Sequence, residues 1–74
     1  MPGSSEGDLD YREFDPLERP EIGVLVDGEW HPGELRAWAR RPSGWWAHVY
    51  YSRHTVHGRL RFPDCVPQHR VRTM

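Results

Sequence analysis

Aromatic rings and guanidinium groups are the chemically informative side chains of this sequence. Its 74 residues include four Trp and three Tyr, and all of its formal positive charges are arginines because lysine is absent. Rings and guanidinium groups on one face can stack on bases and neutralise phosphates, and the same residue types dominate the binding energy of protein interfaces. The pattern therefore predicts a binding face. We assign to this face Trp30, Arg36, Trp38, Arg40, Trp46, Tyr50, Arg59 and Arg61.

Imidazole and thiol groups are a weaker signal, for a metal site. His54 and His57 form a His-x-x-His motif, and Cys65 precedes His69 by four residues. These groups supply the nitrogen and sulfur ligands that zinc prefers, but a strong zinc signature has paired ligands at both ends. We therefore keep these four residues as weak metal candidates and predict no cofactor.

Catalysis has little support in the sequence. Cys65 and His69 could act as nucleophile and base, but no third orienting residue and no phosphate-binding glycine loop accompany them. A domain near this size buries only about 60% of the surface of its unfolded chain, which leaves little volume for a deep substrate cavity. The sequence predicts a protein that is not an enzyme.

Hydropathy and cysteine usage bear on the compartment. No run approaches the ~18 apolar residues of a membrane-spanning helix, and the first residues lack the basic and apolar regions of a signal peptide. The single cysteine cannot form an internal disulfide, which favours a reducing compartment. We expect a cytoplasmic protein without a membrane partner, and the sequence leaves its oligomeric state open.

Charge is segregated along the chain. Residues 1–21 carry seven acids and two arginines, whereas residues 22–74 carry eight arginines and four acids. Prolines at positions 2, 16 and 20 interrupt regular structure in the acidic part, so we predict a disordered acidic arm over residues 1–21. An alternative is a short docking segment, because Leu9, Tyr11, Phe14 and Leu17 have near-helical spacing.

The elements that would position the arginines and rings are strands. From Ile22 onward, short β-branched and aromatic runs alternate with turn signals, and Asp27-Gly28 is typical of a tight hairpin. Alternation within residues 35–40 predicts one face with Leu35, Ala37 and Ala39, and the other with Arg36, Trp38 and Arg40. In the next strand, residues 45–52, Trp45, Ala47, Val49 and Tyr51 oppose Trp46, His48 and Tyr50. We expect an all-β domain over residues 22–74, with five short strands in a closed or nearly closed barrel.

Two short motifs carry a family resemblance. Residues 26–35 (VDGEWHPGEL) resemble the first hairpin of Tudor and agenet domains, and Ser43-Gly44-Trp45-Trp46 with residues 66–71 (VPQHRV) is similar to the paired tryptophans and 3₁₀ turn of SH3 domains. The resemblance implies an SH3-like barrel, a strand plan that the DNA-binding barrel of retroviral-type integrases also has. The Tudor likeness implies an aromatic cage for a methylated cation, built from Trp30 and either Tyr50 or Tyr51, with Asp27 or Glu29 as anionic partner.

These observations favour a binding or adaptor module. We expect a protein or peptide partner first, because the residues from 22 onward carry only a moderate net charge. Nucleic acid is the alternative partner, with the acidic arm acting as an electrostatic gate over the arginines. Salt distinguishes the two, because contacts to several phosphates weaken steeply with ionic strength.

Overall fold

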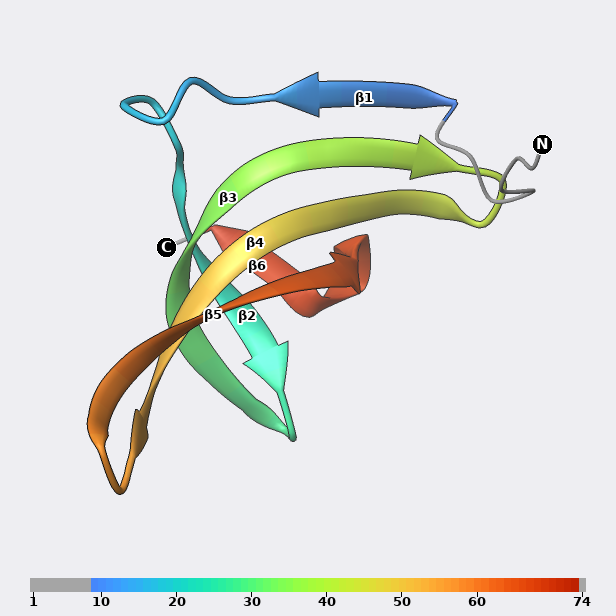
Figure 1. Ribbon diagram of the computed structural model, residues 1–74. Coiled ribbons are helices and arrows are strands. Elements are labelled where there is room, and N and C mark those ends of the chain that lie inside the picture. The colour runs from blue at the N-terminus through green and yellow to red at the C-terminus, as the bar shows by residue number, and fades with distance from the viewer. Residues whose placement is uncertain (1–8, 74) are drawn as a thin grey trace, which may run out of the picture.

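The chain folds as an all-β antiparallel sheet, shown in Figure 1. The computed structural model describes residues 9–73. The elements in chain order are β1 (Asp10–Glu13), β2 (Glu21–Val26), β3 (Glu29–Arg41), β4 (Gly44–Thr55), β5 (Gly58–Pro67), the 3₁₀ helix η1 (Gln68–Arg70) and β6 (Val71–Thr73). The all-β prediction is confirmed.

The strands lie in the order β5-β4-β3-β2-β6, and β1 pairs with β3 outside that path. Among residues 9–73 no ladder joins β5 to β6, so hydrogen bonding does not close the sheet into a barrel. The five strands expected over residues 22–74 are present as β2 to β6, but the expectation of a closed barrel is wrong, because the sheet is open and has β1 as a sixth strand. The sixth strand is β1, which the sequence pattern had assigned to the acidic arm.

β1 and β2 share one edge of β3. β1 pairs with residues 37–40 and β2 with residues 29–34, so the two strands run one after the other along the same neighbour. Between them the chain leaves the edge, and the amide of Phe14 donates to the carbonyl of Arg36 (2.9 Å) while the amide of Leu35 donates to the carbonyl of Pro20 (3.0 Å). We call residues 14–20 the excursion.

The disordered arm predicted over residues 1–21 is wrong for Asp10–Glu13, because these residues form a strand. The alternative of a docking segment describes them better, although they dock as a strand and not with helical spacing. Residues 1–8 of the predicted arm lie outside the described residues.

A β-bulge in β3 decides which side chains share a face. The pairing with β4 shifts between Leu35 and Ala37, so Arg36 is the extra residue. Leu35 pairs with the buried Val49 and Trp38 pairs with the buried Ala47, which places both on the core face. Ala37 and Ala39 pair with His48 and Trp46 instead.

The predicted faces of β3 are therefore wrong from Ala37 onward, because a bulge reverses the alternation. The predicted faces of β4 are confirmed: Ala47, Val49 and Tyr51 are buried, whereas Trp46, His48 and Tyr50 lie on the opposite face, which we call the outer face.

The core is small and lies on the concave side of the bent sheet. Its buried members are Ile22, Val24, Leu35, Ala47, Val49, Tyr51 and Val66. The aromatic and aliphatic side chains packed around them are Phe14, Val26, Trp38, Phe62 and Val71. Phe14 belongs to the excursion, so burial of its ring helps to hold that segment against the sheet.

Two hairpins shape the ends of the sheet. Asp27 and Gly28 both have positive φ (52° and 81°) and join β2 to β3, which confirms the tight turn predicted from this dipeptide. The β4–β5 hairpin projects away from the rest of the sheet (Figure 1). At its tip Val56 is 95% exposed.

Gly33 permits β3 and β4 to approach closely where the sheet bends. A Cβ at this position would overlap the carbonyl oxygen of Tyr50 and lie 3.0 Å from the Cα of Tyr51. Because both obstacles are backbone atoms, the substitution Gly33→Ala should destabilise the fold by about 1 to 3 kcal/mol, the range typical of overpacking. Thermal unfolding followed by circular dichroism measures the change.

Gly23→Ala is the matched control, because a Cβ there meets only side-chain atoms of Arg72 and Trp30, at 3.4 Å. It should change the free energy of unfolding by less than about 0.5 kcal/mol. Equal losses in the two variants would contradict the close approach at Gly33.

Candidate functional site

Three guanidinium groups converge on the ring of Tyr50. The Cζ atoms of Arg61, Arg36 and Arg19 lie 4.5, 4.8 and 5.9 Å from the ring centroid. At these distances the negative face of an aromatic ring attracts a cation by about 0.5 to 1 kcal/mol at exposed sites. The ring therefore holds several positive charges in fixed orientations.

Each arginine reaches Tyr50 from a different element. Arg61 is on β5 and pairs with Ser52, which shares the outer face with Tyr50. Arg36 is the bulge residue of β3, and Arg19 is carried in by the excursion. The site exists because a bulge and an interrupted edge occur at the same point of the sheet.

Glu34 is the counter-ion of this group. It pairs with Tyr50 across the β3–β4 ladder, and its Oε1 accepts hydrogen bonds from Arg61 Nη2 (2.9 Å) and Arg19 Nη1 (3.1 Å). The Nε atoms of Arg19 and Arg36 are buried and have no hydrogen-bond partner among the described residues. We name Arg19, Arg36, Arg61, Tyr50 and Glu34 the arginine cluster, whose formal charge is +2.

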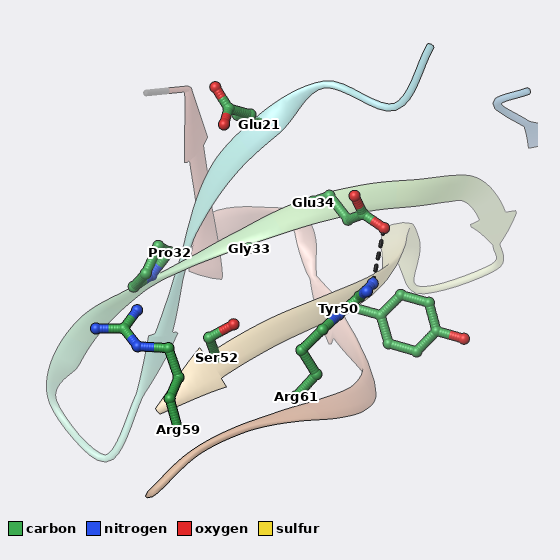
Figure 2. Close-up of a pocket in the computed structure, with 8 residues that line it drawn as sticks. All are labelled: Glu21, Pro32, Gly33, Glu34, Tyr50, Ser52, Arg59 and Arg61. Atoms are coloured by element: carbon green, nitrogen blue, oxygen red, sulfur yellow. Dashed lines mark hydrogen bonds and ion pairs between the residues drawn. The ribbon is translucent and has the colours of Figure 1, made fainter. Parts of the chain in front are cut away.

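A cavity of about 230 Å³ adjoins the arginine cluster on the outer face. Figure 2 shows Ser52 between Arg59 and Arg61, and Pro32 lines the same cavity. Glu21, the cross-strand partner of Glu34, brings a second carboxylate to the rim. The full lining is Glu21, Pro32, Gly33, Glu34, Tyr50, Ser52, Arg59 and Arg61. Arg59 adds one positive charge to the arginine cluster and Glu21 adds one negative charge, so the cluster together with these two residues keeps a formal charge of +2.

The two tryptophans of the outer face, Trp30 and Trp46, also have a guanidinium group close to their rings. Arg72 lies 4.2 Å from the ring centroid of Trp30, and Arg41 lies 5.1 Å from that of Trp46. The Trp46 indole Nε1 also donates to Ser43 Oγ at 3.0 Å. These rings serve as supports for arginines of the same chain, which limits their use as stacking platforms.

Of the eight residues predicted for the binding face, the structure brings four together: Arg36, Tyr50, Arg59 and Arg61. Trp46 and Trp30 lie elsewhere, each in contact with one other arginine: Arg41 and Arg72, respectively. The remaining two, Trp38 and Arg40, are corrections to the prediction. Trp38 is on the core face and Arg40 is the ladder partner of Trp45, because the bulge moved both.

Two members of the site were not predicted. Arg19 is in a segment whose acids and prolines indicated disorder. Glu34 is 15 residues away in the sequence, and only the fold brings its carboxylate to Arg19. The apolar spacing of Phe14 and Leu17 was the available signal that this segment docks, although Leu17 itself remains 95% exposed.

The expected aromatic cage is not formed. Trp30 supports Arg72, whereas Tyr50 belongs to the arginine cluster. Tyr51 is buried on the core face, where its ring contacts Phe62 and His31. Rings that lie on opposite faces or already hold guanidinium groups cannot surround one methylated cation.

The weak metal candidates are distributed along the β4–β5 hairpin and η1. His54 is at the end of β4 and His57 is in the hairpin turn, where Thr55 Oγ1 accepts from the His57 amide (3.0 Å) and donates to the Gly58 carbonyl (2.9 Å). Cys65 is at the far end of β5, and His69 is in η1. Within residues 9–73 no three His, Cys, Asp or Glu side chains are grouped to hold a metal ion.

The surroundings of Cys65 differ from the nucleophile and base pair considered in the sequence. The imidazole that contacts its Sγ belongs to His48 (3.9 Å to Nε2), not to His69, and Arg41 Nη2 lies 3.6 Å from the same sulfur. The His48 ring also packs against the Tyr11 ring, with centroids 5.7 Å apart and an angle of 68° between the ring planes.

Comparison of the chain with known protein families, with curated proteins and with solved structures found no match. In the part of the chain that the structure describes, no helix has the length and apolar character needed to cross a membrane.

Glu34 should stabilise the fold by neutralising the guanidinium groups around it. Glu34→Gln removes the charge and leaves three cations on one ring, so we expect a loss of about 1 kcal/mol, equivalent to a fall in Tm of about 4 to 8 °C for a domain of this size. High salt should restore most of the loss by screening the arginines. Thermal unfolding at low and high NaCl concentration measures both effects.

Glu29→Gln is the control, because that carboxylate is 78% exposed and its contact to His31 Nε2 is long, at 3.9 Å. Its Tm should change by less than about 2 °C. A Glu34→Gln variant as stable as the parent at low salt would show that the cluster needs no counter-ion.

Proposed function

We propose that this chain is a non-enzymatic binding module whose outer face takes an acidic segment of a protein or peptide partner. The observation that supports the proposal is the arginine cluster, in which three guanidinium groups share one aromatic ring and two of them share one carboxylate. Arginines already oriented by their own chain lose little side-chain entropy when they bind an anion.

Glu34 indicates which anion fits. Its carboxylate is held between Arg19 and Arg61 at hydrogen-bonding distance, so the spacing of these guanidinium groups suits a carboxylate. Arg36 and Arg59 are within the same region and have no ion pair in the described structure. An acidic side chain of a partner would bind there, next to Glu34.

Two features favour a protein over a nucleic acid as the partner. The outer-face rings of Trp30, Trp46 and Tyr50 are covered by guanidinium groups, which reduces their capacity to stack on bases. In addition, Glu21 and Glu34 line the cavity, and their carboxylates would repel a continuous phosphate backbone. A mixed-charge site suits a separate acidic side chain with neutral or basic neighbours.

For the fold, we infer an SH3-like arrangement within the open sheet. The strand order and the 3₁₀ helix directly before the last strand are similar to the plan of small SH3-like barrels, with β1 as an addition. Many such barrels are binding modules, although a shared fold does not by itself determine function.

Binding of a fluorescein-labelled peptide of alternating Glu and Gly, followed by anisotropy, tests the proposal. Arg61→Gln and Arg36→Gln should each raise the Kd about fivefold to tenfold, because each removes a charged donor of the site. Arg70→Gln is the matched control: Arg70 is exposed in η1, does not line the cavity beside the arginine cluster, and its removal changes the net charge equally.

The control should change the Kd less than about twofold, the amount expected from a remote exposed charge. Equal effects of all three substitutions would show attraction by net charge alone. Absence of binding to acidic peptides by the parent protein would refute the site.

Nucleic acid is the second candidate, supported by one specific observation. No acid occurs from Leu35 to Pro63, a stretch with six arginines that covers half of β3, all of β4 and the start of β5. The projecting β4–β5 hairpin within it is a two-stranded ribbon, a shape that the DNA major groove admits. For this candidate, the acids of the N-terminal segment would act as a gate by competing with phosphates for the arginines. Among the described residues of that segment, Arg19 is the one that reaches the arginine cluster.

Salt dependence separates the two candidates. A duplex contacted at six or more phosphates should lose about a thousandfold in affinity between about 50 and 200 mM salt, whereas an acidic peptide held by a few arginines should lose less than about tenfold. Anisotropy titrations of both probes measure this directly. Tight duplex binding with the steep slope would replace the first candidate by the second.

A further inference from the structure

A second hollow lies on the opposite side of the sheet from the arginine cluster. Its volume is about 350 Å³, and its walls are Arg12 of β1, Trp38 of β3, Trp45 of β4 and Gln68 of η1. We call it the tryptophan cleft. Neither the arginine cluster nor the cavity beside it shares a residue with this cleft, so a ligand of the cleft is independent of the acidic partner proposed for the outer face.

The cleft is a consequence of the bulge. By reversing the alternation of β3, the bulge moves Trp38 to the core face, where it pairs with Ala47 and meets Trp45. β2 pairs with residues 29–34 of β3 and β6 pairs with β2, so neither strand pairs with the part of β3 that carries Trp38. At the other end of β3 and β4, η1 is the element that approaches, and the two indoles stay half-buried.

The two indoles form an aromatic corner. Their ring centroids are 6.3 Å apart and their planes meet at 85°. A flat apolar group placed in this corner contacts the face of one indole and the edge of the other, which is the favourable geometry for aromatic groups. The volume is at the lower end of the range for small-ligand pockets and suits one aromatic side chain.

The polar groups of the cleft indicate a negative charge on the ligand. The Arg12 side chain is 77% exposed and is the cross-strand neighbour of Trp38. It contacts Asp10 through Nε at 3.4 Å, so its terminal amino groups are not the atoms of that contact. Arg40, also exposed, pairs with Trp45 at the same end of β3. The two arginines outnumber Asp10, and the Gln68 amide supplies a neutral donor and acceptor.

We propose that the tryptophan cleft binds an aromatic carboxylate: the C-terminal aromatic residue of a peptide partner, with its ring against Trp38 and Trp45 and its terminal carboxylate on Arg12. The ring supplies apolar contact to the two indoles that line the cleft on the core face. The carboxylate complements the positive rim. A neighbouring hollow that shares Trp45 and Gln68 leads past Pro67 and His69, which gives the preceding residues of such a peptide a path along η1.

The test uses N-acetylphenylalanine as the acidic probe and N-acetylphenylalanine amide as its neutral counterpart. Two-dimensional ¹H–¹⁵N spectra resolve the indole N–H groups of the four tryptophans, and Trp-to-Phe variants assign them. Titration with the acid to about 10 mM should shift the Trp38 and Trp45 peaks and leave the Trp30 peak in place, with a Kd in the millimolar range.

Arg12→Met isolates the role of the charge, because Arg12 is exposed on an edge and its loss should not prevent folding. In the parent protein the acid should bind about fivefold tighter than the amide, and in Arg12→Met the two should bind equally. Arg70→Met, the control with the same change in net charge, should keep the preference for the acid.

Three results would overturn the proposal. The Trp38 and Trp45 peaks could remain unchanged to the end of the titration, which would mean that the cleft takes no aromatic group. The preference for the acid could survive in Arg12→Met, which would remove the assigned carboxylate contact. Finally, the same two peaks could shift with protein concentration alone, which would mean that a second copy of the chain fills the cleft.

Discussion

The bulge at Arg36 is the constraint on which the rest of the structure depends. Inserting one unpaired residue between Leu35 and Ala37 reverses the alternation of β3, so Trp38 moves to the core face and Ala37 and Ala39 move away from it. The same point is where β1 ends and the chain departs from the edge of β3, to return at Pro20. The bulge and the excursion together place Arg19 and Arg36 beside Tyr50, where Arg61 arrives from β5.

Like charges are stable in this arrangement because each has a favourable neighbour. The Tyr50 ring attracts all three guanidinium groups, and Glu34 accepts hydrogen bonds from two of them. Glu34 faces Glu21 directly across the β2–β3 ladder, where two carboxylates repel each other. The arginines relieve that repulsion, so the fold and the site stabilise each other.

Much of this could be predicted from the sequence, and the errors have a physical origin. The Asp27-Gly28 turn and the two faces of β4 followed from local backbone preferences and from a regular alternation. Arg36, Tyr50 and Arg61, three of the residues assigned to the binding face, lie close together. The bulge has no clear local signal, because Arg36 fits an extended backbone with or without a partner. Trp38 was therefore assigned to the wrong face, and Arg40 with it.

Arg19 could not be predicted because its segment is held by tertiary contacts, namely the ring of Phe14 on the core and backbone bonds at the bulge.

The most direct test of the arginine cluster is the set of nuclear Overhauser effects from the Tyr50 ring protons. We predict cross-peaks to the side-chain methylenes of Arg19, Arg36 and Arg61. Cross-peaks to Arg61 alone, with Arg19 at random-coil chemical shifts, would contradict the cluster, because the excursion would then not reach Tyr50.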